Sequence, residues 1–325
     1  MSPSRPAPAG GDRGGAPAWA GLLPVDKPTG VTSHDVVERA RRALGLRAIG
    51  HLGTLDPGAS GLLVLALGAA TRCAVVWQGG RKTYEGTARF GVVTDSQDLD
   101  GRVVARSDAL PGESQVREAA LGMVGDIDQV PPMVSAVKQG GERLYALARR
   151  GITVPRDARR VRVEAWRWLE FAGADARFEV ECSAGTYVRT LVHDLGAQLG
   201  CGAALASLRR TRSEPFTLAR ACTWEDLGQR PPEALLAELG LPLDLALEAL
   251  PAVSLGPAET AAIGCGQAPR VEPGAAPVDG GPRSVVFRDA GGRALALGAL
   301  CREADGVRAR PSVVFPWAVR ARQSA

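Results

Sequence analysis

The chain has 325 residues, of which 45% are hydrophobic and 23% charged, with a formal net charge of +4. This length is enough for a sizeable catalytic domain with a smaller one appended, so two domains are expected. No apolar run is long enough to span a bilayer, and no signal-type apolar segment is visible, so we expect a cytoplasmic protein without membrane contacts. The small net charge does not by itself identify a nucleic-acid-binding protein.

The cysteine and histidine content argues against metal chemistry. The six cysteines are scattered without a Cys-x-x-Cys pair, and the chain has only three histidines. This distribution indicates neither a zinc site nor a disulfide framework. We therefore expect neither a metal nor a cofactor.

The first predicted elements form a strand, a turn and a helix. A short apolar strand begins at Gly21 and leads into a turn formed by Lys27 to Gly30. Thr32 or Ser33 then caps a helix that ends at Gly45. The apolar face of this helix is formed by Val36, Val37, Ala40 and Leu44.

The middle of the chain mixes strands with helices. Strands are predicted at residues 61–67, 83–90 and 177–184; the first is a continuous apolar run and the last alternates. A helix with regularly spaced Val and Leu follows, from about Val188 to Leu199. Because the elements do not alternate regularly as βαβ units, the pattern favours an α+β domain.

The C-terminal part reads as a small β domain. Near 230–250 the chain is rich in Leu, Ala and Pro. Short strands are then predicted at residues 284–287, 294–300 and 312–315, with Gly, Pro and Asp turns between them.

The most unusual segment runs from His51 to Gly61 and places glycines at 53, 58 and 61 around one acid, Asp56. With Pro57 next to the acid, it predicts a rigid, tightly turned loop that leads into a buried strand. An Asp-Pro pair is usually only a turn. A carboxylate at the rim of an apolar core, however, must be paired or functional, so Asp56 is the leading candidate site residue.

This loop and four further motifs resemble those of the bacterial tRNA pseudouridine-55 synthases (TruB-type), in the same order between residues 21 and 215. The further motifs are Lys27–Ser33, Lys82-Thr83-Tyr84, Thr94-Asp95-Ser96-Gln97-Asp98 and Gly185–Thr190. The resemblance implies an α+β pseudouridine-synthase fold with a mixed, mainly antiparallel sheet. It implies an isomerase that converts uridine-55 in the T-loop of tRNA to pseudouridine.

The resemblance also implies a domain organisation. From their composition, mostly Pro, Gly, Ala and Arg, residues 1–18 are expected to form a disordered tail. Residues 19–248 form the catalytic domain, with a basic RNA-binding insertion at about 129–160. Residues 249–325 resemble the small β-barrel RNA-binding PUA domain.

Individual roles follow from the matched motifs. The resemblance makes Asp56 the nucleophile, Arg189 its ion-pair partner and Tyr84 the ring stacked on the target base. Substrate contacts are implied for His51, Tyr84, Tyr187 and Leu208. The reaction replaces the N1–C1′ bond by a C5–C1′ bond, and a guanidinium beside an aspartate keeps such a nucleophile ionised. Attack at C1′, attack at C6 and removal of a 2′ proton all stay open.

Without the resemblance, these residues have plainer interpretations. Tyr84 in an alternating strand is more often a core residue, and Arg189 at the start of a helix is more often a surface charge. Leu208 is a core leucine. The acidic run from Asp95 to Asp100 lacks the spacing of a calcium loop, and we interpret it as a turn that orders the floor of the active site.

Basic residues cluster between Glu142 and Arg167, where only three acids occur. Because opposite charges at i+4 spacing are mostly missing, RNA contact is favoured over a solvated helix face. In the family this region resembles an insertion that folds over the T-loop. The predicted RNA-binding residues are Lys138, Arg143, Arg149 and Arg150, together with Arg209 and Arg210 from a second cluster. The predicted partner is tRNA, bound by a monomer.

Two alternatives remain. A guide-RNA-dependent pseudouridine synthase shares the catalytic motifs and the PUA-type end, although the basic insertion favours the stand-alone form. The other is a non-catalytic RNA-binding or tRNA-folding protein. Intact Asp56, Tyr84 and Arg189 argue against it.

Overall fold

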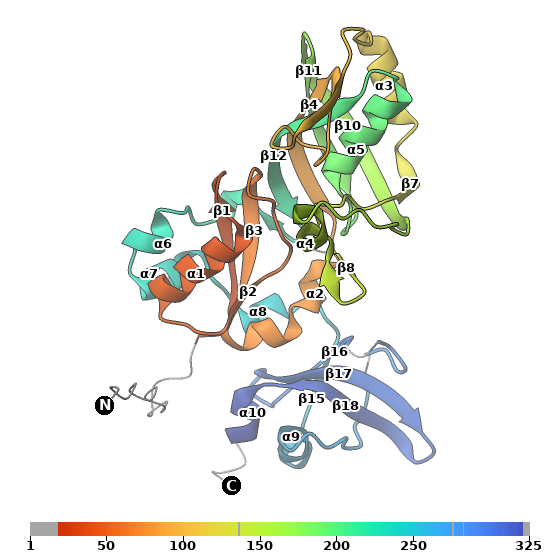
Figure 1. Cartoon of the computed structure of the whole chain (residues 1–325). Coiled ribbons are helices and arrows are strands. Elements are labelled where there is room, and N and C mark those ends of the chain that lie inside the picture. Colours follow the sequence, from red (N-terminus) through yellow and green to blue (C-terminus); the bar gives the residue numbers. More distant parts are fainter. Residues whose placement is uncertain (1–18, 136, 275, 282, 321–325) are drawn as a thin grey trace, which may run out of the picture.

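The computed structural model describes residues 19–135, 137–274, 276–281 and 283–320 (Figure 1). The predicted tail at residues 1–18 lies outside this range. No helix among the described residues is long and apolar enough to cross a membrane.

In the described part of the chain, ten strands form one mixed sheet in the order β14-β1-β3-β12-β4-β11-β10-β7, with β13 paired to β12 and β2 to β3. Its strands are β1 Gly21–Lys27, β2 Ile49–His51, β3 Ser60–Leu67, β4 Lys82–Phe90, β7 Gly125–Gln129, β10 Arg159–Ala172, β11 Asp175–Cys182, β12 Ala203–Ser213, β13 Phe216–Thr217 and β14 Leu241–Pro242. Among the described strand pairs of this ten-stranded sheet, only β3–β12 is parallel. The expectation of a mixed, mainly antiparallel α+β fold is confirmed.

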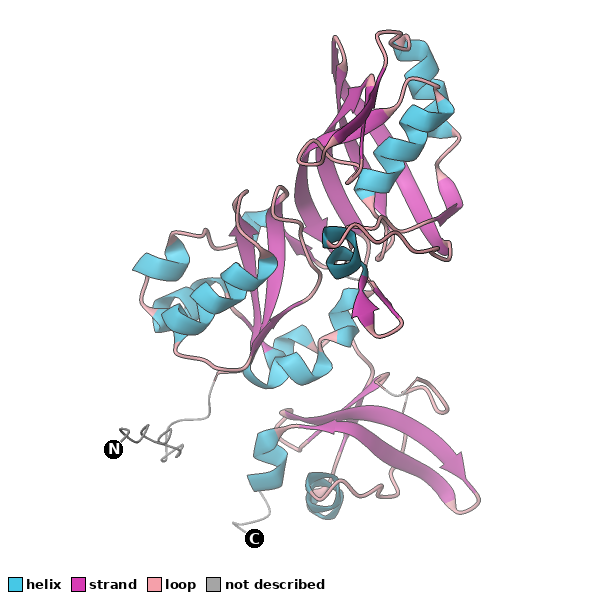
Figure 2. Cartoon of the chain, viewed as in Figure 1, coloured by secondary structure: helices cyan, strands magenta, loops and turns pink. Residues whose placement is uncertain are grey.

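Helices cover this sheet (Figure 2). They are α1 Ser33–Leu44, α2 Val75–Gln78, α3 Glu113–Leu121, α4 Leu144–Arg149, α5 Val188–Gln198, α6 Asp226–Gln229, α7 Pro232–Leu239 and α8 Leu243–Ala246, with 3-10 turns η1 Gly68–Cys73 and η2 Leu218–Arg220. In Figure 1, α3 and α5 lie together against the half of the sheet that contains β10 and β12, whereas α1, α6 and α7 lie beside β1 and β3.

Helix α1 begins and ends where its sequence predicts. The Thr32 hydroxyl accepts a hydrogen bond from the Asp35 backbone N–H, and the Asp35 carboxylate accepts one from the Thr32 N–H. This capping box satisfies donors that have no partner inside the helix. Gly45 ends the helix with a φ of 64°, a conformation that glycine adopts without steric cost.

Strand β3 explains the continuous apolar run. Its residues alternate between two buried clusters, with Leu63, Leu65 and Leu67 in one and Leu62, Val64 and Ala66 in the other. Burying such a side chain fully stabilises the fold by roughly 1.5–3 kcal/mol. A strand with a core on both faces needs apolar residues at every position, whereas β4 faces a core on one side and alternates.

The C-terminal region forms a second sheet in the order β15-β16-β17-β18, followed by α10 Pro316–Arg320. Its strands are β15 Ala252–Ser254, β16 Val285–Arg288, β17 Ala294–Glu303 and β18 Gly306–Val314, and α9 Pro257–Gly264 packs against the last two. Strand β18 begins earlier than predicted, because its first half is rich in arginine and lacks the apolar pattern of a strand. Among the described residues β15 and β18 do not pair, so the sheet is open and the expected closed barrel is not found.

This second sheet does not stand apart from the first. Three residues of the C-terminal region, Val286, Leu297 and Phe315, belong to the same buried cluster as Leu62, Val64 and Ala66 of β3. The Arg72 guanidinium in η1 also donates a hydrogen bond to the Val314 carbonyl. The two sheets therefore share an apolar core.

Candidate active site

Asp56 lies on the loop between β2 and β3, at the point where β3 and β12 run parallel. The two strands approach so closely there that a Cβ on Gly61 would lie 2.2 Å from the Arg210 carbonyl oxygen. Gly61 also has a φ of 99°, which side chains disfavour. The glycine after the loop is thus required by backbone packing.

Residues of the Lys27–Ser33 motif form hydrogen bonds with the backbone of this loop. The Ser33 hydroxyl donates a hydrogen bond of 3.0 Å to the Leu55 carbonyl and accepts one of 2.9 Å from the Leu55 N–H. One residue beyond Asp56, the Pro57 carbonyl accepts a hydrogen bond of 2.8 Å from the Gly30 N–H. The two motifs are therefore parts of one structure, although Ser33 and Leu55 are 22 positions apart in the chain.

Lys27 completes this support. Its side chain is fully buried, and the ammonium donates hydrogen bonds to the carbonyls of Pro28, Val31 and Pro57. Burial lowers the pKa of Lys27 to about 8, against the attraction of the Asp56 carboxylate, which raises it. Lys27 belongs to the Lys27–Ser33 motif, but its sequence context does not indicate this role.

Arg189, the second residue of α5, forms an ion pair with Asp56. Arg189 Nε lies 3.0 Å from Asp56 Oδ2, with the arginine side chain 4% exposed and the aspartate side chain 44% exposed. Its two terminal nitrogens donate to the carbonyls of Ser96 and Val134, at 2.9 and 2.8 Å. The pattern-based interpretation of Arg189 as a surface charge is wrong, because the start of α5 is buried.

The acidic turn between β5 (Val92–Thr94) and β6 (Val103–Arg106) supports this pair. Asp98 Oδ2 lies 3.5 Å from Arg189 Nη1, and the Ser96 hydroxyl donates to the Asp98 carboxylate. Burial raises the pKa of Asp98, opposed by the Ser96 hydrogen bond and by the Arg189 charge. The turn therefore contacts Arg189 and lies next to the Asp56–Arg189 pair.

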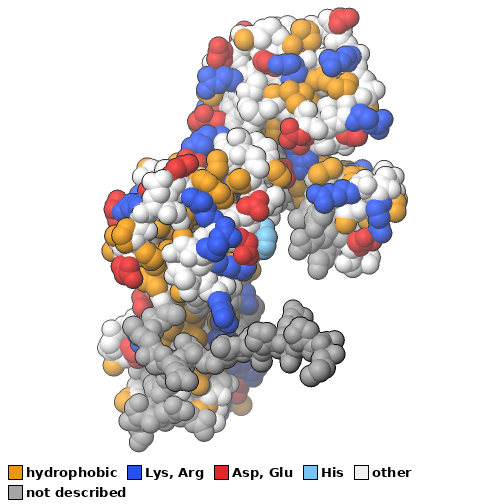
Figure 3. Space-filling view, turned by 60° about the vertical axis from the view of Figure 1, so that its left-hand side comes forward, with side chains coloured by type: hydrophobic (Ala, Val, Ile, Leu, Met, Phe, Trp, Pro, Cys, Tyr) orange, Lys and Arg blue, Asp and Glu red, His pale blue; other side chains and the backbone are white. Residues whose placement is uncertain are grey.

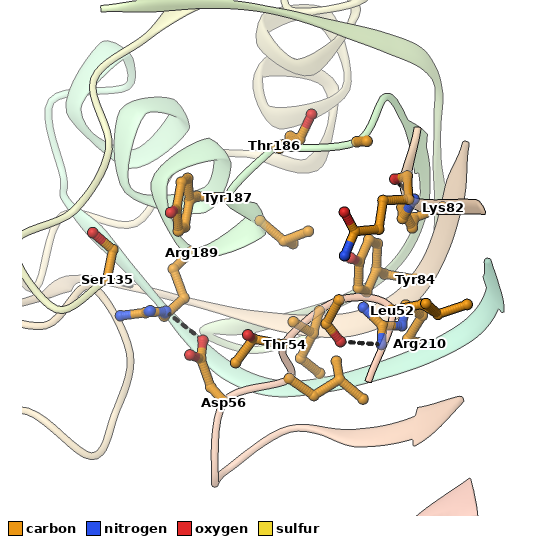
Figure 4. Close-up of a pocket in the computed structure, with 17 residues that line it drawn as sticks. Leu52, Thr54, Asp56, Lys82, Tyr84, Ser135, Thr186, Tyr187, Arg189 and Arg210 are labelled. Atoms are coloured by element: carbon orange, nitrogen blue, oxygen red, sulfur yellow. Dashed lines mark hydrogen bonds and ion pairs between the residues drawn. The ribbon is translucent and has the colours of Figure 1, made fainter. Parts of the chain in front are cut away.

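A pocket of about 310 Å³ opens beside this ion pair (Figure 4). It is lined by Leu52–Asp56, Gln78, Lys82, Tyr84, Ser135, Ala184–Arg189, Leu208 and Arg210. Asp56 and Arg189 lie at one side of the pocket and Tyr84 at the other. Tyr84 is 8% exposed, and burial raises the pKa of its hydroxyl. The structure therefore brings Asp56, Arg189, Tyr84, Tyr187 and Leu208 together around one cavity.

His51 and Arg210 lie differently from what we expected. His51 ends β2, is half-buried and does not line this pocket; burial lowers the pKa of its imidazole. Arg210 is 3% exposed, and its guanidinium donates to the carbonyls of Leu62 and Gly53 at 2.7 and 3.1 Å. Because this guanidinium is buried and tethers the loop, its placement corrects the prediction of a surface phosphate contact.

Among the other predicted RNA-binding residues, Arg149, Arg150 and Arg209 are exposed or partly exposed. Arg209 forms an ion pair of 2.7 Å with Asp26, and Arg150 forms one of 2.7 Å with Glu142. Arg149 ends α4 and is exposed. The backbones of Lys138 and Arg143 pair in the hairpin of β8 Lys138–Gln139 and β9 Glu142–Arg143, but their side chains are outside the described part.

The sequence predicted few acidic partners for the arginines between Glu142 and Arg167, and this prediction is only partly correct. Arg160 pairs with Asp128 and Arg162 with Asp126, residues that lie opposite each other on β10 and β7. The i+4 spacing applies to a helix, whereas this part of the basic cluster is a strand whose partners come from its neighbour. The space-filling view shows a hollow between the insertion and the body that carries α1, with Lys and Arg side chains on both sides (Figure 3).

Sequence reasoning missed two further residues, Gln129, which binds the backbone of the pocket residue Tyr187, and Ser135. Gln129 is 2% exposed, accepts a hydrogen bond of 2.8 Å from the Tyr187 N–H and donates one of 3.1 Å to the Tyr187 carbonyl. Ser135 is 6% exposed and lines the pocket. Neither carries a sequence signal, because each is defined by residues far away in the chain.

Comparisons with known proteins show which family the chain is similar to. The model of the TruB family pseudouridylate synthase N-terminal domain matches residues 41–188, and that of the tRNA pseudouridylate synthase B C-terminal domain matches residues 189–248. The tRNA pseudouridine synthase B of Syntrophotalea carbinolica is 43% identical over 280 residues, which cover 85% of this chain and 90% of that protein. The enzyme of the same name from Symbiobacterium thermophilum is 50% identical over 228 residues, 67% and 76% of the two chains.

Two solved structures are also similar to this chain. A chain of a Cbf5-Nop10-Gar1 complex superposes with a TM-score of 0.66 at 28% identity, covering 91% of this chain and 84% of that one. A chain of the archaeal box H/ACA sRNP Nop10-Cbf5 complex gives a TM-score of 0.65 at 26% identity, with coverages of 92% and 88%.

Proposed function

Because the chain belongs to the TruB family of pseudouridylate synthases, we propose that it isomerises uridine-55 in the T-loop of tRNA to pseudouridine. One observation carries the chemistry: the partly exposed Asp56 carboxylate lies 3.0 Å from the buried Arg189 guanidinium, at the side of a pocket whose other side is formed by Tyr84. A carboxylate paired with a buried guanidinium beside a pocket for the base suits this reaction.

The residues around the pocket have different roles in the proposed reaction. At about 310 Å³ it suits one nucleoside rather than a helix, so the target uridine must leave its stack to enter. Asp56 acts as the nucleophile, Arg189 pairs with its carboxylate, and Tyr84 holds the uracil while the N1–C1′ bond breaks and the C5–C1′ bond forms. In the balanced reaction C5 loses a hydrogen and N1 gains one. Tyr187 and Leu208 line the same pocket, and His51 contacts the RNA beside it.

We propose that tRNA lies across the basic insertion, with Lys138, Arg143, Arg149, Arg150 and Arg209 near its phosphates. A folded loop read by shape, backbone charge and stacking matches the principles of RNA recognition. Residues 19–248 then form the catalytic domain, and the open sheet beyond residue 249 is the counterpart of a PUA-like RNA-binding domain. We propose that the enzyme acts as a cytoplasmic monomer without a metal or cofactor.

The guide-RNA-dependent alternative is less well supported. Identity is 43–50% with bacterial proteins named tRNA pseudouridine synthase B, but 26–28% with chains of the Cbf5 complexes. The basic insertion also suits an enzyme that binds its substrate directly. A purely RNA-binding or tRNA-folding protein does not need an aspartate–arginine pair at a nucleoside-sized pocket.

The direct experiment is to incubate the purified protein with an unmodified tRNA transcript and to map pseudouridine along it. We expect one site, uridine-55, without any added RNA. The Asp56→Asn variant should form no product while its tRNA affinity stays within a few-fold, since the amide keeps the shape but is no nucleophile. Asp108→Asn, at an exposed aspartate, is the matched control. Turnover by Asp56→Asn would overturn the assignment, and a requirement for a guide RNA would support the alternative.

A further inference from the structure

The hydroxyl of Ser135 is a buried polar group that has no hydrogen-bond partner among the described residues. Its residue is 6% exposed and lines the pocket that also contains Asp56 and Arg189. Buried hydroxyls are nearly always hydrogen-bonded, and one without a partner destabilises the free protein. At the wall of a substrate pocket, the missing partner is most simply an atom of the substrate.

The backbone around Ser135 is fixed, so this hydroxyl is held in place before substrate binds. The Val134 carbonyl accepts a hydrogen bond of 2.8 Å from Arg189, and the Ser135 N–H donates one of 3.0 Å to the Met133 carbonyl. The arginine that pairs with Asp56 therefore also anchors Ser135. The position of the hydroxyl is thereby coupled to that of the nucleophile.

The location of Ser135 identifies the part of the nucleotide that it faces. Figure 4 shows Ser135 on the same side of the pocket as Asp56 and Arg189, away from Tyr84. In the proposed function, on which this step rests, the base lies against Tyr84 and C1′ lies near Asp56. Ser135 therefore faces the ribose. The hydroxyl attached next to C1′ is the 2′-hydroxyl.

We propose that Ser135 Oγ hydrogen-bonds the 2′-hydroxyl of the target uridine and so makes the pocket selective for a ribonucleotide. Both groups are hydroxyls that donate and accept, so their pairing satisfies each of them. A phosphate is a poorer partner here, because the Arg189 charge is already paired with Asp56 and Asp98. The 2′-hydroxyl is also the group by which a protein distinguishes RNA from DNA.

The test measures binding, so that turnover does not interfere. Four proteins are compared, all in the Asp56→Asn background: no further change, Ser135→Ala, Ser135→Thr, and Ser207→Ala as a control at an exposed serine outside this pocket. Each is titrated with a T-arm hairpin that carries either uridine or 2′-deoxyuridine at the target position. A neutral hydrogen bond corresponds to about three- to tenfold in affinity, so the parent and Ser207→Ala should prefer uridine by this factor.

Ser135→Ala should bind both hairpins equally, at the affinity of the parent for 2′-deoxyuridine, and Ser135→Thr should keep a preference. If Ser135→Ala retains the full preference, or weakens both hairpins by the same factor, the contact is not with the 2′-hydroxyl and the proposal is overturned. Thermal melting adds an independent readout. Without RNA, Ser135→Ala should melt no lower than its parent, because it removes an unpaired buried group; a clear decrease would assign the hydroxyl a structural role instead. Failure of the wild-type protein to form pseudouridine would count against the proposed function and is measured separately.

Discussion

Arg189 Nε lies 3.0 Å from Asp56 Oδ2, and the other two guanidinium nitrogens donate to main-chain carbonyls. All three nitrogens of one buried side chain are thus engaged. The guanidinium holds the Asp56 carboxylate, the acidic turn and the start of the insertion in one arrangement. A planar fork with fixed donor directions suits this role better than a point charge.

Arg189→Lys should therefore lower the rate although the charge is kept. A compact ammonium cannot hold the carboxylate and both carbonyls at once, and we expect kcat to fall by about 10- to 100-fold. Single-turnover kinetics with saturating tRNA measures this. Arg167→Lys, at an exposed pair with Glu179, is the matched control and should keep its rate. A wild-type rate for Arg189→Lys would mean that the pairing with Asp56 is not needed for chemistry.

Lys27 predicts a specific dependence of stability on pH. The folded-state pKa of about 8 lies below the ordinary value of 10.5, because burial disfavours the ammonium. Below about pH 8 the lysine is charged in both states, and its burial cost is fully present. Between 8 and 10.5 the unfolded chain keeps a proton that the folded chain has lost, so this residue makes the free energy of unfolding rise with pH.

Urea unfolding of the wild type and of Lys27→Met, measured from pH 7.5 to 10, tests this directly. Methionine has a similar length and no charge, so the variant should lack the rise while all other titrating groups are shared. The free energy of unfolding of the wild type minus that of Lys27→Met should therefore increase as the pH rises. A difference that stays constant across this range would contradict the lowered pKa.

Gln129 should act through the backbone of Tyr187. Gln129→Met keeps the volume but leaves the buried N–H and carbonyl of Tyr187 without these partners, which should destabilise the protein by about 1–3 kcal/mol. Because Tyr187 precedes α5, the position of Arg189 should loosen and kcat should fall as well. Chemical denaturation and steady-state kinetics measure the two effects. Gln115→Met, at the exposed cap of α3, should leave kcat unchanged.

The basic insertion predicts a change in salt dependence. Changing Lys138, Arg143, Arg149 and Arg150 together to Gln should weaken tRNA binding, and each lost phosphate contact should reduce the log–log salt slope by roughly 0.7–0.9. Loss of the exposed Arg150–Glu142 pair should itself change stability by less than about 1 kcal/mol. Affinity and kcat are measured at two salt concentrations, with Arg117→Gln on α3 as the control.

The two outcomes of that experiment have different meanings. Weaker binding with kcat kept at saturating tRNA indicates a phosphate clamp. A fall in kcat together with affinity indicates that the insertion closes over the pocket and completes the site. An unchanged affinity and slope would remove the cluster from the RNA-binding surface.

Several secondary-structure elements, the family and the candidate residue Asp56 could be predicted from the sequence alone. The α1 capping box, the alternation of β4 and the apolar run of β3 depend on local residues, so their positions were predicted closely. The five motifs identified the family, which the comparisons confirm. Asp56 also stood out locally, since an acid among turn residues just before a buried strand is unusual.

Only the tertiary structure decided how these parts meet. The Lys27 ammonium, the Gln129 amide and the buried Arg189 guanidinium bind groups supplied by other segments of the chain, which no local pattern encodes. Residues 126 and 128 became partners of the β10 arginines because two strands pair in one register. That the Ser135 hydroxyl has no partner among the described residues could be recognised only from the positions of the surrounding donors and acceptors, because satisfaction of a hydrogen bond is a property of the packed chain.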